Sequence, residues 1–376
     1  MSVPEFAVVF PRAGVTGGVE RVALDLVRYE SGRRETIFVG ETVDVDDVPH
    51  RLVRTARVPT ALRPLAFRRA ASAVLRELRP ATTLSFGANC PPGDVYWVHS
   101  VHRAWLDDGG QVAFHGIGVP AAVRRLLLRH QVLLRVEREY FTNHRPRAIL
   151  CTSPREVDDL ERLYRVPRDI MHVVPNGFDP AAFSLERRAA HRADMREAIG
   201  AADDAIVVLM VANEWHRKGL GPLLEAVAAL GDPRVRVDLV GVRPPTDYEP
   251  IAHRLGLGAR LHWHGPSADV AQYHAAADVF ALPTTYEPFG LVIIESMASG
   301  LPVVTSRLAG ASPAIENGRN GFLLDDPRDV GELTAALQPL LDPATRERIG
   351  TTAARTIADY RSDNVLARAD RIIFGS

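Results

Sequence analysis

The chain has 376 residues, of which 46% are hydrophobic and 24% are charged, and its formal net charge is −1. This length exceeds one ordinary core and predicts two domains, and the balanced composition excludes a disordered or fibrous chain. No apolar run approaches the ~20 residues that a membrane-spanning helix needs, and we find no signal-peptide pattern. Cys90 and Cys151 lack metal-ligand spacing, so we expect reduced, buried thiols in a cytoplasmic protein.

Short apolar runs alternate with helical patterns along the chain. The predicted strands are Phe6–Phe10, Thr36–Val39, Thr82–Phe86, Val95–His99, Ala148–Thr152, Met171–Val174, Ala205–Ala212, Arg236–Val240, Arg260–His264, Val279–Leu282 and Pro302–Thr305. The predicted helices include Val19–Val27, Leu65–Leu78, Ala121–Phe141, Leu220–Leu230 and Leu291–Ser299. Strands regularly separated by helices form parallel sheets that are covered on both faces. The expected fold class is therefore α/β, with doubly wound, Rossmann-like domains.

The alternating pattern begins afresh near Ala205, after the turn-rich stretch Pro175–Pro180. We expect an N-terminal domain over residues 1–178 and a C-terminal domain over residues 179–355. A final helix in residues 356–376 is expected to pack back on the N-terminal domain. Ligands of doubly wound sheets lie beyond the carboxyl ends of the strands, which predicts a site in a cleft between the domains.

The small net charge conceals an uneven distribution. Residues 51–150 contain 16 arginines and 6 acidic residues, so this segment carries +10 and the rest of the chain −11. The predicted helices Leu65–Leu78 and Ala121–Phe141 combine arginines with leucines. Such helices can contact an anionic membrane or hold an anionic acceptor, but we favour ordinary domain helices with buried leucines. We expect no nucleic-acid partner, and peripheral membrane contact stays open.

Lys218 is the only lysine among the 45 basic residues. An ammonium is a compact point charge and a guanidinium is a planar fork, so this lysine indicates a geometry that arginine cannot reproduce. Lys218, with Arg217 before it and Gly219 after it, lies at a predicted strand-to-helix turn. Two adjacent cations and a glycine at such a turn suit a phosphate. A solvated surface lysine is the alternative, and we favour the anion site.

A second strand-to-helix turn follows the predicted strand Val279–Leu282. Its loop carries Glu287, and Glu295 lies eight positions later on the next predicted helix. The exposed amides at the start of that helix and its positive end are expected to form an anion cradle. The predicted cradle and turn consist of Pro288, Phe289, Gly290 and Leu291.

Two carboxylates beside an anion cradle repel a phosphate, but they can accept hydrogen bonds from sugar hydroxyls. We therefore expect a sugar diphosphate here, with Glu295 on the nucleotide ribose and Glu287 on the transferred sugar. Lys218 and Arg217 would neutralise the diphosphate. The alternative makes Glu287 a helix-capping acid and Glu295 a solvated residue. Glu295 has apolar neighbours on its helix, which favours the functional interpretation.

At this point the chain resembles the retaining glycosyltransferases of family 4, which have the GT-B fold of two facing Rossmann-like domains. Their signature of two glutamates separated by seven residues is read here as Glu287 and Glu295. The other matching segments, in chain order, are Gly17–Arg21, Ser153–Arg165, Pro175–Asp179, Gly300–Val304 and Asn317–Phe322. The resemblance is strong from Ala205 to Leu324 and weak between Val43 and Leu150, where such families build acceptor sites.

The chain departs from the family pattern ahead of Lys218. The family usually has Gly-Arg-Leu there, whereas this sequence has Asn213, and Arg217 adjoins Lys218. That arrangement is similar to the lipopolysaccharide core glucosyltransferases of the same family, which carry an Arg-Lys-Gly triplet. The resemblance places Asn213 at the donor site and makes Lys218 a safer assignment than Arg217 for the leaving phosphate.

Two further candidates lie in the N-terminal half. Gly17 and Gly18 follow the first predicted strand and allow the backbone to approach a phosphate or sugar closely, so we expect a donor contact there. His99 and His102 follow the predicted strand that starts at Val95. Family members often have a histidine here, near the transferred sugar, although a strand histidine is commonly a satisfied core residue. The sequence does not choose between the two histidines.

These patterns predict an enzyme that moves a sugar from a UDP- or GDP-type donor to an acceptor hydroxyl. Retention of anomeric configuration and independence from metal are implied by the resemblance, and we expect no cofactor. The acceptor stays open among a small natural product, a lipid-linked sugar and a polysaccharide. The alternatives are a nucleotide-sugar epimerase or phosphorylase of the same fold, and a non-catalytic sugar-nucleotide-binding protein.

Overall fold

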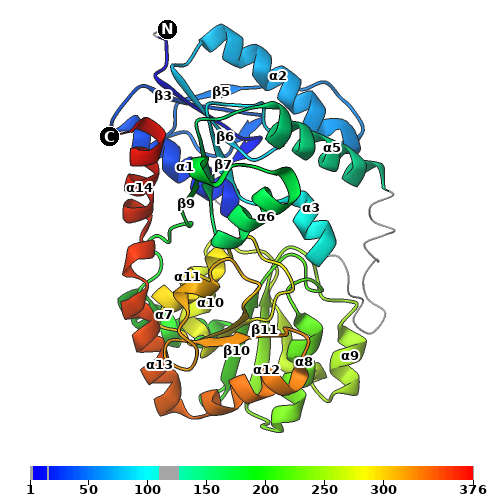
Figure 1. The fold of residues 1–376 in the computed structure, drawn as a ribbon. Coiled ribbons are helices and arrows are strands. Elements are labelled where there is room, and N and C mark those ends of the chain that lie inside the picture. Colours follow the sequence, from blue (N-terminus) through cyan, green and yellow to red (C-terminus); the bar gives the residue numbers. More distant parts are fainter. Residues whose placement is uncertain (1–2, 15–16, 110–126, 376) are drawn as a thin grey trace. The chain divides into compact units, whose positions relative to one another are not determined.

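A computed structural model of the chain describes residues 3–14, 17–109 and 127–375 (Figure 1). The described residues form two compact units. Unit 1 runs through Asn176 and resumes at Asp363, and unit 2 comprises Gly177–Ser362. The sequence placed these divisions after residues 178 and 355. The second division lies later because the Phe178 amide bonds the Tyr360 carbonyl and the Ser362 amide bonds the Phe178 carbonyl, which holds this stretch in unit 2.

Unit 1 is built on a parallel sheet of seven strands in the order β5-β3-β1-β6-β7-β8-β9. The strands are β1 (Phe6–Val9), β3 (Thr36–Gly40), β5 (His50–Leu52), β6 (Thr82–Phe86), β7 (Val95–Val98), β8 (Ala148–Cys151) and β9 (Met171–Val173). A separate pair joins β2 (Arg12–Ala13) to β4 (Thr42–Val43). The helices are α1 (Gly18–Ser31), α2 (Arg63–Leu78), α3 (His102–Ala104), α5 (Leu128–Asn143), α6 (Pro154–Tyr164) and α14 (Ser362–Phe374). One π-turn spans Trp105–Gly109.

The last helix of the chain, α14, packs on unit 1. The Phe374 ring meets the Phe6 ring edge-on at 5.2 Å, and Asp370 pairs with Arg34 at 2.7 Å. Arg147 also donates to the Ile373 carbonyl at 2.6 Å. Burying an aromatic ring contributes roughly 1.5–3 kcal/mol, so these contacts fix the end of the chain on the sheet of unit 1.

Unit 2 is built on a parallel sheet of six strands in the order β12-β11-β10-β13-β14-β15. The strands are β10 (Ile206–Val211), β11 (Val235–Val240), β12 (Leu261–Trp263), β13 (Val279–Leu282), β14 (Val303–Ser306) and β15 (Phe322–Leu324). The helices are α7 (Leu185–Ala198), α8 (Leu220–Leu230), α9 (Glu249–Arg254), α10 (Ala271–Ala276), α11 (Leu291–Ala298), α12 (Val330–Leu337) and α13 (Pro343–Thr356). None of the helices in the described ranges is both long and apolar enough to cross a membrane.

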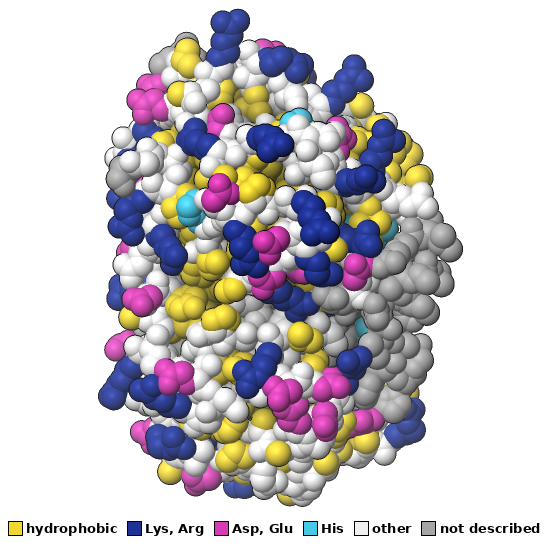
Figure 2. Space-filling model, in the orientation of Figure 1, with side chains coloured by type: hydrophobic (Ala, Val, Ile, Leu, Met, Phe, Trp, Pro, Cys, Tyr) yellow, Lys and Arg dark blue, Asp and Glu magenta, His cyan; other side chains and the backbone are white. Residues whose placement is uncertain are grey.

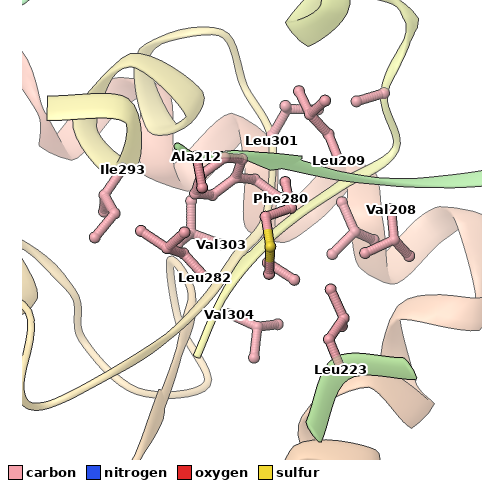
Figure 3. Close-up of a cluster of buried hydrophobic side chains, with 14 of the residues drawn as sticks. Val208, Leu209, Ala212, Leu223, Phe280, Leu282, Ile293, Leu301, Val303 and Val304 are labelled. Carbon is pink, nitrogen blue, oxygen red and sulfur yellow. The ribbon is translucent and has the colours of Figure 1, made fainter. Parts of the chain in front are cut away.

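The core of unit 2 lies between this sheet and its helices (Figure 3). Phe280 and Leu282 of β13 and Val303 of β14 pack with Ile293 of α11 and Leu223 of α8, and all five side chains are fully buried. The near-continuous apolar strands are typical of a parallel sheet that helices cover on both faces. This packing holds the starts of α8 and α11 beside the ends of their preceding strands.

The structure contains every predicted strand and adds short ones. The additions β5 and β15 are edge strands of three residues; β5 is exposed along its whole length and has no apolar pattern, whereas β15 is apolar but very short. The predicted helix Ala121–Phe141 corresponds to α5, which begins at Leu128. Residues 121–126 of that prediction lie outside the described residues.

In each sheet the first strand lies at the centre, and the chain builds outward first to one side and then to the other. In unit 2 the neighbours β10 and β13 mark the point where this direction reverses, and in unit 1 the neighbours are β1 and β6. The loops that leave such a pair diverge and open a crevice at the carboxyl ends of the strands. The loops after β10 and β13 carry the predicted site residues.

Candidate functional site

The loops after β10 and β13 are joined by several direct contacts. The Arg217 carbonyl accepts hydrogen bonds from the Thr285 amide at 2.9 Å and from the Thr284 and Thr285 hydroxyls at 3.2 Å each. Gly219 has φ +83°, and a Cβ there would lie 2.0 Å from the Pro283 carbonyl oxygen. Only glycine tolerates both that conformation and that approach. The two loops therefore form one surface at the reversal point of the sheet.

Lys218 and Glu287 form an ion pair across these two loops. The side chains of both residues are largely buried, with exposed fractions of 11% and 13%. Burial, and then the Arg217 guanidinium, lower the pKa of Lys218, while Glu214 raises it. The Glu287 carboxylate in contact with the ammonium favours its charged form. Lys218 therefore carries a positive charge that is largely buried, and the Glu287 side chain is its ion-pair partner.

Arg217 supports the same pair from the side. Its Nε donates to the Glu214 carboxylate at 2.6 Å, and its Nη1 donates to the Tyr286 carbonyl. The same Nη1 lies 3.7 Å from a carboxylate oxygen of Glu287. The guanidinium therefore fixes the loop that carries Glu287, and it adds a second positive charge next to Lys218.

Two backbone amides of the loop after β14 donate hydrogen bonds to carbonyl oxygens of the turn that precedes α11. The Gly310 amide donates to the Glu287 carbonyl at 2.9 Å, and the Ala311 amide donates to the Phe289 carbonyl at 2.7 Å. A trans peptide directs its N–H away from its C=O, so the Gly290 amide points away from Ala311. Among the described residues, the Phe289, Gly290 and Leu291 amides donate no hydrogen bond. These backbone amides at the start of α11 therefore stay available to donate hydrogen bonds to a ligand.

The start of α8 differs, because its own turn uses its amides. The Lys218, Gly219 and Leu220 amides donate to carbonyls of residues 214, 216 and 215. Of the two adjacent helix starts, α11 therefore presents the open amides and α8 presents the cation. Gly290, with φ +93°, is the residue that turns the chain into α11.

Glu295 lies on α11, four residues after Leu291, and only 2% of its surface is exposed. Residues four apart share one face of a helix, and four residues span about 6 Å of helix axis. Glu295 is thus one turn from the open amides. Asn213 lies at the end of β10, and its Oδ1 accepts a hydrogen bond from the Val242 amide at 3.0 Å. Asn213 therefore ties the loop after β11 to the loop that carries Lys218.

In unit 1 the predicted glycines stand at the start of α1. Gly17 is the N-cap and Gly18 is the first helical residue. A Cβ on Gly17 would lie 1.8 Å from a carboxylate oxygen of Glu20. The side chain of Glu20 therefore occupies the space beside Gly17, and a phosphate could use this space only if that carboxylate moved.

His99 follows β7 and is held on both ring nitrogens. Its Nε2 lies 3.1 Å from Asn176 Oδ1, and its Nδ1 lies 3.4 Å from the Trp97 carbonyl. The ring also stacks on Phe86 at 5.1 Å. Burial lowers the pKa of His99 to about 4, so the ring is neutral near pH 7.

His102 begins α3 and contacts a second histidine. Its Nε2 lies 3.1 Å from His130 Nδ1, and it stacks on Trp105 at 5.4 Å. Burial, followed by the nearby charges of His130 and Arg129, lowers the pKa of His102 to about 4. Its backbone amide donates to the buried carboxylate of Glu137.

Sequence reasoning missed four residues that position these groups. Gly310 and Ala311 orient the turn before α11, and Asn176 and His130 contact the two histidines. Each belongs to a segment distant along the chain from its partner, and although Asn176 lies in the turn-rich stretch Pro175–Pro180, nothing there indicates His99 as its partner. Among the described residues, no three His, Cys, Asp or Glu side chains are grouped as a metal site.

Comparison with known proteins gives matches to both units. The family described as "Glycosyltransferase Family 4" matches residues 16–182, and the one described as "Glycosyl transferases group 1" matches residues 205–343. Together they cover most of the chain. The chain is 25% identical to the lipopolysaccharide glucosyltransferase WaaG of Escherichia coli K12 over 238 residues, 62% of this chain and 64% of that protein. It is 30% identical to a D-inositol 3-phosphate glycosyltransferase of Streptomyces avermitilis over 281 residues, 69% of this chain and 60% of that protein.

The alignments thus span less than two thirds of the length of these curated relatives. Among solved structures, WaaG superposes with a TM-score of 0.84 at 21% identity, covering 99% of this chain and 100% of that one. HepE of Anabaena, solved with UDP and glucose, superposes with a TM-score of 0.74 at 19% identity, covering 99% and 100%. These structural likenesses show the GT-B fold, with its two Rossmann-like halves.

Proposed function

Because this chain belongs to glycosyltransferase family 4, we propose that it transfers a sugar from a UDP- or GDP-type donor to an acceptor hydroxyl with retention of anomeric configuration. The observation that carries the proposal is the contact between Lys218 and Glu287 beside the open amides of α11. At this reversal point of the sheet, the cation suits the diphosphate of a nucleotide sugar, and the carboxylate suits the sugar hydroxyls. The amides suit the leaving oxygen. Names among the relatives, including a structure with UDP-glucose, support a donor of this kind.

In the proposed mechanism the diphosphate takes the place of Glu287 against the Lys218 ammonium. The freed carboxylate then accepts hydrogen bonds from hydroxyls of the transferred sugar, and Glu295 accepts them from the ribose. As the bond to the sugar breaks, negative charge grows on the leaving phosphate. Lys218 and the Gly290 and Leu291 amides stabilise that charge without reorganising. We propose that these groups supply the charge a metal would otherwise supply, and that no cofactor takes part.

We further propose that unit 1 receives the acceptor. His99 and His102 are neutral near pH 7 because burial lowers both pKa values to about 4. A neutral imidazole can donate one hydrogen bond and accept another, but both His99 nitrogens already face Asn176 and Trp97, so an acceptor hydroxyl would have to replace one of these contacts. Cys90 and Cys151 are free and buried, which supports the proposed location in the cytoplasm.

A thermal-shift experiment tests the donor assignment. Ligand that binds only the folded state raises the melting temperature by mass action. We expect UDP or GDP to raise the melting temperature of the native chain, and Lys218→Ala and Glu295→Ala each to abolish the shift. Arg319→Ala, which removes an exposed side chain of unit 2 that pairs with Glu316, serves as the matched control and keeps it. If neither nucleotide shifts the native chain, the donor site is wrongly assigned.

Release of the nucleoside diphosphate then tests the reaction. The native chain should release UDP or GDP from its nucleotide sugar, slowly with water and faster with a competent acceptor, and should do so in the presence of EDTA. Lys218→Ala should lose this release by roughly 10²- to 10³-fold, the cost of removing one group that stabilises developing charge. Binding of the nucleotide without any release from the sugar would leave a binding protein and contradict the proposal.

A further inference from the structure

A separate pocket of about 550 Å³ lies in unit 1 between α5, α6 and the start of α3. Its volume falls within the range of small-molecule sites. Of the described residues, eight side chains line it; four of these are arginines, namely Arg103, Arg135, Arg138 and Arg165, and none is acidic. Figure 2 shows basic side chains gathered over α5 and beside α6. The pocket is part of neither of the loops that carry Lys218 and Glu287.

Three of these arginines differ from the fourth in having no acidic partner among the described residues. Arg103 pairs with Asp107 at 2.9 Å. Within the described ranges, Arg135, Arg138 and Arg165 form no ion pair. Three guanidinium groups around one hollow repel one another, and an anion bound among them removes that cost. Elsewhere in unit 1, Arg12, Arg28 and Arg34 each pair with a carboxylate.

The three cations are presented by fixed backbone. Arg135 and Arg138 are three residues apart on α5 and therefore project from one face of that helix. Arg165 ends α6 in the left-handed conformation, with φ +56°. This region costs a residue with a side chain about 1 kcal/mol relative to glycine, which is the usual residue at such helix ends. Arg165 therefore occupies a position where the backbone conformation favours glycine.

The wall of the pocket is apolar and rigid. Leu134, Leu163 and Tyr164 line it beside the arginines. The Tyr164 hydroxyl donates to the buried Glu137 carboxylate, and its ring stacks on Phe141 at 5.4 Å. Because the hydroxyl is already bonded inward, Tyr164 presents its ring to the pocket. A ligand for this site must combine an anionic group with a body that packs on leucine and tyrosine.

We propose that this pocket binds a phosphate monoester, with the phosphoryl oxygens held by Arg135, Arg138 and Arg165 and the organic body lying on Leu134, Leu163 and Tyr164. A guanidinium offers paired N–H groups that match two phosphoryl oxygens, so three of them can satisfy one phosphate dianion. The site lies beside the predicted acceptor histidines, since Glu137 bonds Tyr164 and also the backbone amides of His102 and Arg103. It does not depend on the proposed donor chemistry.

Phenyl phosphate is the probe, because it joins a phosphate monoester to an apolar ring, and benzyl alcohol is its neutral counterpart. We expect saturable binding of phenyl phosphate by titration calorimetry and none of benzyl alcohol. Arg165→Gly should weaken binding roughly tenfold, and Arg135→Gln combined with Arg138→Gln should abolish it, since each lost charged hydrogen bond costs about a factor of ten or more. The binding should also weaken steeply with salt.

Arg79 supplies a matched control. It ends α2 in the same left-handed conformation, with φ +51°, in the same unit but away from the pocket. Arg79→Gly should leave phenyl phosphate binding unchanged. Equal weakening by Arg79→Gly and Arg165→Gly would show general attraction to a basic surface and overturn the proposal. Both variants should keep the shift in melting temperature with UDP or GDP, which separates a failed phosphate pocket from a failed donor site.

A second arm identifies the source of the monoester. Phosphatidylcholine vesicles that contain phosphatidic acid display a phosphate monoester headgroup, and vesicles of phosphatidylcholine alone do not. If phosphatidic acid vesicles bind the native chain and compete with phenyl phosphate, the monoester is borne by a lipid. If phenyl phosphate binds and those vesicles do not compete, the monoester is a soluble molecule. Absence of saturable binding in both arms overturns the proposal.

Discussion

The two units share one topology but place different chemistry at its reversal point. In unit 2 the loops after β10 and β13 carry a cation and a carboxylate that contact each other, and the second loop leads to the open amides of α11. In unit 1 the corresponding loop after β1 leads to Gly17, and the carboxylate of Glu20 fills the space beside it. The sheet order alone therefore does not make a phosphate site. The charge and hydrogen-bonding groups on the loops decide which unit takes the diphosphate.

The candidate histidines of unit 1 belong to a different part of its sheet. His99 and His102 follow β7, and both are neutral and surrounded by aromatic rings. In the proposed function, unit 2 would hold the charged donor and this part of unit 1 would hold the neutral hydroxyl groups of the acceptor. Four substitutions test this contrast.

The largest effect is expected for Glu287→Gln. The amide cannot pair with Lys218 as an ion or accept from two sugar hydroxyls as a carboxylate does, so sugar transfer should fall by about 10²- to 10³-fold. Binding of UDP or GDP should persist, because the bound diphosphate itself supplies the negative charge that favours the Lys218 ammonium. Initial rates and calorimetry measure the two quantities. Glu214→Gln, at a carboxylate that contacts Arg217 and is 49% exposed, should change both far less. Equal losses in the two variants would refute a special role for Glu287.

The next largest effect concerns the loop that orients the α11 amides. A Cβ on Gly310 would lie 1.8 Å from the Pro288 carbonyl oxygen. Gly310→Ala should therefore lower the free energy of unfolding by about 1–3 kcal/mol and weaken nucleotide binding, because the turn must shift. Gly318→Ala adds a methyl group in open space at φ +78°. It should cost about 1 kcal/mol and leave binding intact. Urea unfolding and thermal shift distinguish them, and unchanged binding in Gly310→Ala would contradict this account.

The histidines of unit 1 should make stability depend on pH. Burial lowers the pKa of His99 from 6.5 to about 4, so the unfolded chain binds the proton more readily. The contribution of the neutral histidines to the free energy of unfolding is complete above pH 6.5 and is lost as the pH falls toward 4. Because these rings are only partly shielded from water, we expect this contribution to be roughly 1–2 kcal/mol. Urea unfolding at pH 7 and pH 5 should show a smaller difference for His99→Gln than for the native chain. A steeper dependence in that variant would reverse the assigned sign.

The smallest effect is expected for Asn213→Ala. This change removes the hydrogen bond between Asn213 Oδ1 and the Val242 amide, which is worth about 1 kcal/mol. Unfolding free energy should fall by that amount, and the KM for the donor should rise less than about tenfold. A loss of activity as large as that of Lys218→Ala would show that Asn213 contacts the donor directly and does not act through the loop.

Much of the fold could be predicted because its signals are local. Most strands of the two sheets are rich in apolar residues, and turn residues separate them from the next helix. The edge strand β5 was missed because His50–Leu52 has no apolar run, and β15 was missed because its apolar run has only three residues directly after a glycine. Glu287 and Glu295 could be paired because seven intervening residues that cross one turn and enter a helix hold them near each other.

The amino-acid pattern was enough to predict the alternation of strands and helices, the role of the single lysine, and the two glutamates of one turn. Three-dimensional packing was needed to show that Lys218 meets Glu287 across 68 intervening residues, and that Gly310 and Ala311 hold the turn before α11. It likewise decided that His99 meets Asn176 and that three arginines from α5 and α6 share one pocket. The physical reason is that apolar period and turn residues act over a few positions. Strand order in a sheet, in contrast, brings together loops that are far apart along the chain.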